Sequence, residues 1–179
     1  MTEETLKIIS SLFMPVVLLI LGVWLKQIAA KHEKRASLND RIIEKRIAVY
    51  EKVGTDLNDI YVFLLRVGHW KQLTPEEVLE KKRQIDKVMY VNKPYWSEAA
   101  FGAFETFMQT AFETYTGIGE DAKFRVKTDQ FKQLPHWQET WQQCFTQNAD
   151  NISHKTEIRD NYQRLIREFS DDFGHYSED

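Results

Sequence analysis

Residues 8–25 read IISSLFMPVVLLILGVWL, a stretch of 18 residues without one ionisable side chain. As a helix this stretch would be about 27 Å long, close to the roughly 30 Å hydrocarbon core of a bilayer. Its Ile, Leu, Val and Phe residues each favour insertion by roughly 0.3–0.6 kcal/mol, which is enough to offset the serines, the glycine and Pro15. The stretch therefore predicts a transmembrane helix, and residues 1–26 are assigned to an N-terminal membrane anchor.

A cleaved signal peptide is the alternative interpretation of this stretch. Signal peptides begin with a basic region, whereas the first seven residues of this chain contain Glu3 and Glu4 against a single basic residue, Lys7. This balance of charge favours a retained anchor over a cleaved signal.

Basic residues crowd the C-terminal side of the apolar stretch. Seven lysines and arginines lie between positions 26 and 46, while Lys7 stands alone on the other side. Because basic flanks stay in the cytoplasm, this asymmetry predicts a single-pass membrane protein with its C-terminal domain in the cytoplasm. Trp24, as an interfacial aromatic residue, and Lys26, by extending its ammonium group towards the headgroups, would mark the inner membrane boundary.

Small or polar residues recur along one side of the predicted span. They are Ser11, Pro15, Leu18 and Gly22, at steps of four, three and four residues. Such a stripe allows close packing between helices, as in an oligomer whose spans surround a lumen. Two serines and a glycine are also ordinary in any span, so a stripe without a special role is the alternative.

Composition predicts a helical domain after the anchor. The chain of 179 residues is 42% hydrophobic and 28% charged, which can build one core with a solvated surface. Seven glycines and four prolines are too few for the frequent turns of an all-β fold. The expected fold is therefore all-α, with one N-terminal transmembrane helix followed by a cytoplasmic helical bundle.

Apolar periodicity assigns residues 27–72 to a basic juxtamembrane turn and a long helix over 37–68. This helix should begin at Ser37, with Asp40 as its capping partner. It carries two apolar stripes side by side and therefore needs two partners. The sequence leaves open whether the second partner is a helix of the same chain or a neighbouring copy.

Capping signals divide residues 73–173, the rest of the helical domain. Thr74, followed by a proline and by Glu77, predicts a helix that runs to about Val91, and Ser97 predicts the start of a third helix. The stretch 117–135 is expected to form a loop. One long or two short helices should follow, and residues 174–179 should form a flexible tail.

Motifs of common chemical sites are absent from the sequence. It contains no phosphate-binding loop, nucleophile elbow or dinucleotide fingerprint. His136, Cys144 and His154 lie eight and ten residues apart, which fits no usual zinc spacing. We therefore expect neither a metal nor a cofactor, and the formal net charge of -3 argues against stable DNA binding.

One pattern approaches a catalytic motif, the Arg-x4–6-His pattern of HEPN ribonucleases. In that motif the arginine stabilises charge on the scissile phosphate and the histidine handles the proton of the 2′-hydroxyl. Arg66 and His69 are too close together for this spacing, and Arg167 and His175 are too far apart.

The best analogue of the motif is Gln147-Asn148-x5-His154, which makes Asn148 and His154 the catalytic candidates. A glutamine, however, cannot supply the positive charge of the missing arginine. The sequence therefore predicts no ribonuclease activity, and a polar cluster at a helix end is the plainer interpretation.

An N-terminal span, a basic turn, a helical domain and a degenerate HEPN-like C-terminal segment occur together in this chain. In this architecture it resembles the small membrane accessory proteins of type VI-B CRISPR loci. The resemblance implies a pore of several subunits that acts with an RNA-guided nuclease and strengthens antiphage defence by permeabilising or depolarising the inner membrane. It also implies that His154 has a structural or assembly role.

The leading hypothesis is thus a homo-oligomeric inner-membrane pore whose partners are further copies of itself and the lipid bilayer. A membrane-tethered HEPN-type ribonuclease is one alternative. A single-pass scaffold that recruits a cytosolic partner is the other, and it differs from a pore in leaving the membrane potential unchanged.

Overall fold

The computed structural model describes residues 3–114, 117 and 119–174, without the side chains of residues 3–20, 29, 33, 35 and 36. The chain divides into two units. Residues 1–42 form the N-terminal unit, and residues 43–179 form the C-terminal unit.

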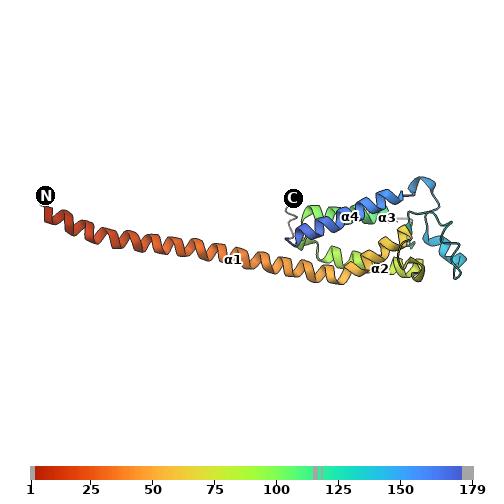
Figure 1. The fold of residues 1–179 in the computed structure, drawn as a ribbon, viewed down its shortest axis with the longest axis horizontal. Helices are drawn as coiled ribbons and strands as arrows, with labels where there is room; N and C mark the ends of the chain where they lie inside the picture. Colours follow the sequence, from red (N-terminus) through yellow and green to blue (C-terminus); the bar gives the residue numbers. More distant parts are fainter. Residues whose placement is uncertain (1–2, 115–116, 118, 175–179) are drawn as a thin grey trace. The chain divides into compact units, whose positions relative to one another are not determined.

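Helix α1 spans Glu3–Leu65, 63 residues in all (Figure 1). The predicted helix start at Ser37 is therefore wrong, because Ser37 lies inside α1. No glycine or proline occurs between positions 23 and 53, so nothing in the local sequence interrupts the helix. A capping signal in the middle of such a run does not begin a new helix.

No helix in the described part of the chain combines the length and the apolar character needed to cross a membrane. This finding contradicts the predicted N-terminal transmembrane helix and the single-pass inner-membrane localisation. It also removes the support for Trp24 and Lys26 as membrane-boundary residues and for the expected pore in a lipid bilayer.

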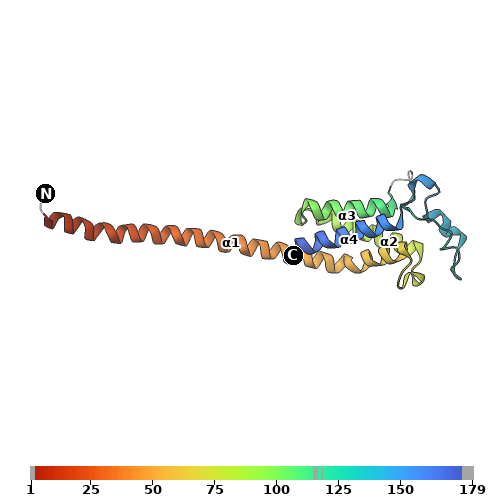
Figure 2. The ribbon, with the colours of Figure 1, turned by 45° about the horizontal axis from the view of Figure 1, so that its top comes forward.

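Four helices build the C-terminal unit. The last part of α1 is joined by α2 (Pro75–Val91), α3 (Glu98–Ala111) and α4 (Lys155–Asp172), and α3 and α4 pack along each other (Figures 1 and 2). Stacked rings of Tyr61 and Tyr162, 4.0 Å apart, join α1 to α4. The expected helical bundle is thus confirmed for this unit.

Short elements complete the C-terminal unit. They are the 3-10 turns η1 (Trp70–Gln72), η2 (Lys93–Tyr95), η3 (Glu139–Cys144) and η4 (Ala149–Asn151), and the strands β1 (Phe112–Glu113) and β2 (Lys123–Phe124). The two strands pair antiparallel, with Phe112 opposite Phe124. This pairing and an isolated parallel bridge between Phe124 and Phe145 depart from an all-α fold, and β2 lies in the stretch expected to be a loop.

Local capping chemistry sets the starts of α2 and α3 as predicted. The Thr74 hydroxyl accepts from the Glu77 amide and the Glu77 carboxylate accepts from the Thr74 amide, which completes a capping box. Ser97 caps α3 by accepting from the Ala100 amide at 3.1 Å.

Both apolar stripes of α1 are buried inside the C-terminal unit from Val49 onward. Leu57 and Leu64 from one stripe and Val53 and Ile60 from the other are each 1% exposed or less. The two partners that the sequence required for this segment therefore come from the same chain.

Aromatic rings dominate the core of this unit. Phe63 lies 5.1 Å from Phe124 and 4.8 Å from Phe131, and Phe145 lies 5.1 Å from each of these two rings. All four side chains are fully buried. The stretch after α3 is thus held to the helices by its phenylalanines.

A buried polar relay joins α3 to the chain around α4. The Ser153 hydroxyl donates to the Thr110 carbonyl at 2.7 Å, and the Asn161 amide donates to the Thr110 hydroxyl at 2.8 Å. Thr110 in turn donates to the Thr106 carbonyl at 2.9 Å. Each buried polar group in the relay therefore has a partner.

Candidate functional site

The two residues predicted as catalytic candidates occupy capping positions. The Asn148 side chain accepts from the Asp150 amide at 3.0 Å and caps η4. His154 is the exposed N-cap residue of α4, and its side chain makes no capping hydrogen bond. Gln147, which stands at the position of the motif's arginine, donates to the carbonyls of Gln142 and Phe145.

The arginines and histidines considered for the HEPN-like motif do not pair with one another in the described structure. His69 contacts Asp59, with 2.9 Å between its Nε2 and the carboxylate Oδ1. His175 lies outside the described residues.

The predicted packing stripe of the N-terminal span is described at one position only. The side chains of Ser11, Pro15 and Leu18 lie outside the described residues. At Gly22, an added Cβ would meet no atom within 4 Å, so no close helix contact is present there in this single chain.

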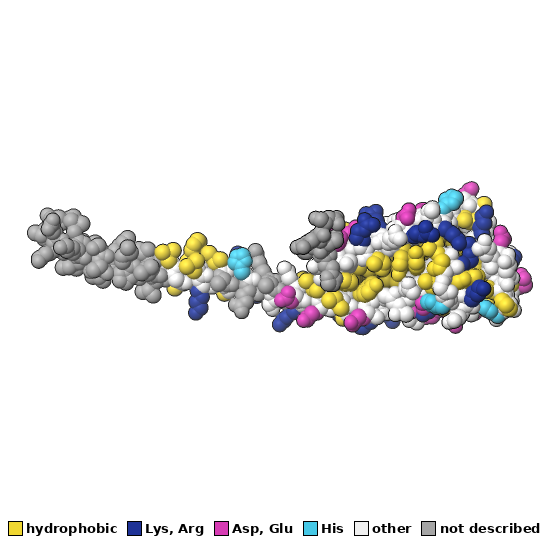
Figure 3. Space-filling view, in the orientation of Figure 1, with side chains coloured by type: hydrophobic (Ala, Val, Ile, Leu, Met, Phe, Trp, Pro, Cys, Tyr) yellow, Lys and Arg dark blue, Asp and Glu magenta, His cyan; other side chains and the backbone are white. Residues whose placement is uncertain are grey.

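A different stripe is prominent on the described part of the N-terminal unit. Its members are large apolar side chains that are 37–59% exposed, namely Leu21, Trp24, Leu25, Ile28 and Leu38. In Figure 3 hydrophobic side chains gather on one side of this stretch of α1, and a basic side chain projects from the other. We call this set the α1 stripe.

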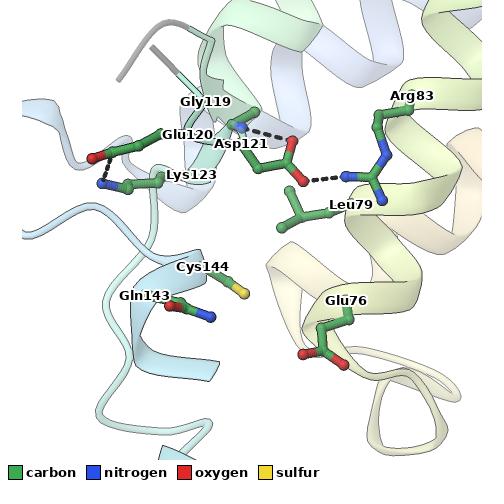
Figure 4. Close-up of a pocket in the computed structure, with 10 residues that line it drawn as sticks. Glu76, Leu79, Arg83, Gly119, Glu120, Asp121, Lys123, Gln143 and Cys144 are labelled. Carbon is green, nitrogen blue, oxygen red and sulfur yellow. Dashed lines mark hydrogen bonds and ion pairs between the residues drawn. The ribbon is translucent and has the colours of Figure 1, made fainter. Parts of the chain in front are cut away.

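A hollow of about 490 Å³ lies between α2 and the segment 119–144 (Figure 4). Four of its five charged side chains form ion pairs, because Arg83 bonds to Asp121 and Lys123 bonds to Glu120, and Glu76 is the fifth. Cys144 lines the same hollow, and burial, as the main cause, raises the pKa of its thiol to about 11. A protonated thiol is a poor nucleophile, so this hollow lacks an activated group for covalent chemistry.

We expect Cys144 to react with iodoacetamide at pH 7.5 at least about tenfold more slowly in the folded protein than in denaturant, because its thiolate is scarce and buried. The folded rate should climb as the pH rises towards 11. Mass spectrometry of the intact chain, which has one cysteine, gives both rates directly. Equal rates in folded and unfolded protein would contradict the buried position.

The carboxylate of Asp59 contacts two side chains, those of His69 and Lys81. Asp59 is 7% exposed, and its two oxygens lie 2.9 Å from His69 Nε2 and 3.1 Å from Lys81 Nζ. Lys81 also bonds to Asp56 at 2.5 Å, and this bond is the main cause that raises its pKa. We call these four residues the Asp59 cluster.

The Asp59 cluster borders an open hollow of about 540 Å³. An aspartate that orients a histidine is the supporting part of a nucleophilic triad, but no serine, threonine or cysteine lines the described hollow. The cluster is therefore best explained as a structural tie between α1, η1 and α2. Sequence reasoning missed it, because its bonded partners are 10 to 25 residues apart and follow no motif.

Metal chemistry finds no support in the described part of the chain, where no three His, Cys, Asp or Glu side chains lie close enough to hold an ion. Comparison with known protein families, with characterised proteins and with solved structures found no match for this chain. The resemblance to the type VI-B accessory proteins therefore stays a prediction from architecture alone.

Proposed function

We propose that this protein is a homo-oligomeric scaffold, assembled through the α1 stripe, in which each copy contributes one C-terminal unit. The observation that carries the proposal is the exposure of Trp24, Leu25 and Ile28 at 59%, 58% and 37% on a helix that makes up the whole of the described N-terminal unit. A single helix cannot bury an apolar side of its own, so such a side calls for a second surface.

The spacing of the stripe favours a second copy of the chain as that surface. Ile28 follows Leu21 by one heptad. Leu38 and Ile42 follow Trp24 and Ile28 by two heptads, and the heptad positions between them hold Lys31 and Arg35. Apolar residues that return every seven positions face the partner in a coiled coil, where identical helices supply matching surfaces. The opposite side of the same helix carries Val23, which is 56% exposed, with Ala30 and Arg41, and so offers a smaller apolar area than the α1 stripe.

Mass measurements on two matched variants test this proposal. We expect the purified full chain to form a defined oligomer by light scattering, and Ile28→Glu to raise the concentration needed for assembly at least about tenfold, because a carboxylate would be buried in the contact. Ala30→Glu adds the same charge two residues away on the opposite side and should leave the oligomer unchanged.

Two outcomes would overturn the proposal. A monomeric full chain would show that the α1 stripe binds a different protein and not a second copy of this chain. An equal response of Ile28→Glu and Ala30→Glu would show that assembly does not use the α1 stripe.

A further inference from the structure

A hollow of about 400 Å³ lies in the C-terminal unit where the end of α1 meets the start of α4. It shares no lining residue with the Asp59 cluster. Its polar lining consists of Arg66, Lys71, Lys155, Gln130 and Gln133, with the half-buried ring of Trp70. None of the residues that line it is acidic.

The three cations of this hollow have no carboxylate partner among the described residues. Every ion pair in that part of the chain involves other side chains. Lys155 donates to the Leu65 carbonyl at 3.0 Å, and the buried Nε of Arg66 has no hydrogen-bond partner. In the hollow of Figure 4, by contrast, Arg83 and Lys123 each bond to an acidic side chain.

The backbone of Arg66 is held in a conformation that a side chain disfavours. Its φ is 59°, the one positive φ among the described residues other than glycine, and this region costs an ordinary residue about 1 kcal/mol or more. The guanidinium lies 5.5 Å from the centre of the Phe131 ring, which fixes its position. A strained backbone and a packed side chain together preorganise this cation.

Burial acts on two of the cations, and neighbouring positive charge acts on one of them, Lys155. Burial lowers the pKa of Arg66. Burial, followed by the charges of Arg66 and Arg159, lowers the pKa of Lys155. A bound anion would relieve this repulsion and satisfy the free donor of Arg66. The first amides of α4, which begins at Lys155, add a partial positive charge at the same place.

We propose that this hollow binds a nucleoside phosphate, with the phosphate on Arg66, Lys71 and Lys155 and the base against Trp70. Guanidinium and ammonium groups are the usual partners of phosphate oxygens. Aromatic rings stack on nucleobases, and the amides of Gln130 and Gln133 can bond to base or sugar. The volume lies within the range of small-molecule sites.

Calorimetry with the full chain and three probes tests this site. We expect ADP to bind, inorganic phosphate to bind more weakly, and adenosine not to bind measurably at concentrations up to about 10 mM. Lys71→Gln and Lys155→Gln should each weaken ADP binding by about tenfold or more, because each removes one charged contact. Lys87→Gln, an exposed lysine of α2 outside the hollow, should change the affinity by less than about twofold.

Lys71 is exposed and lies over the ring of Trp70, with 6.0 Å from its Nζ to the ring centre, so its variant removes a charge from the hollow without removing a hydrogen bond or an ion pair of the described structure. The proposal is overturned if the wild-type chain fails to bind ADP, or if all three lysine variants lose affinity equally. It is also overturned if adenosine binds as well as ADP, or if a short oligoribonucleotide binds at this hollow and ADP does not.

Discussion

Phe63→Ala should lower the free energy of unfolding by about 3–5 kcal/mol, the range for a fully buried phenylalanine. The side chain is 0% exposed and contacts the rings of Phe124 and Phe131, which come from a segment without helical structure. Its loss would leave a cavity between α1 and that segment. Denaturant unfolding followed by circular dichroism measures the change.

Val91→Ala is the control for this prediction, because Val91 is 73% exposed and its truncation should change stability by less than about 0.5 kcal/mol. A loss below about 1 kcal/mol for Phe63→Ala would show that the segment is not packed on α1 as described.

Asp59→Ala should lower the free energy of unfolding by about 2–3 kcal/mol. The substitution removes the bonds to His69 and Lys81 from a carboxylate that is 7% exposed. This loss of free energy should be smaller than for a buried ion pair whose remaining partner has no other bond, since Lys81 keeps its bond to Asp56 and His69 is half-exposed. The same unfolding experiment measures it.

Glu80→Ala is the control for this prediction, because Glu80 is an acidic residue that lines the same hollow as the Asp59 cluster. Glu80 bonds to Arg83 at the exposed surface of α2 and should be replaceable without a measurable change in the unfolding midpoint. If Asp59→Ala behaved like Glu80→Ala, the Asp59 cluster would have no structural role.

Helix starts were predictable from the sequence where a short signal specifies them. Thr74 with Glu77, and Ser97 on its own, satisfy backbone donors within three residues, so no distant contact is needed to recognise them. Ser37 carries a similar signal inside a run of good helix formers, and there the continuous helix prevails. A cap sequence specifies a helix start only where the preceding residues leave the helix.

The site residues were less predictable, because their positions depend on contacts between distant segments. Lys155 reaches the carbonyl of Leu65, 90 residues earlier in the chain, and thereby brings Arg66 and α4 to one hollow. Hydropathy alone likewise predicted a membrane helix over 8–25, which the described structure does not support. A contact between distant segments, such as that of Lys155 with Leu65, leaves no periodic pattern in the sequence that would identify it.

The relay through Thr110 has a consequence for how many packings the bundle can adopt. Sliding α4 along α3 by one helical turn, about 5.4 Å, would separate Ser153 and Asn161 from Thr110 at once. Each polar group stranded in this way costs about 1–3 kcal/mol, whereas neighbouring apolar contacts could re-form almost anywhere along the helix. The hydrogen bonds of Ser153 and Asn161 to Thr110 thus favour one alignment of α4 on α3 over others that apolar contacts alone would allow.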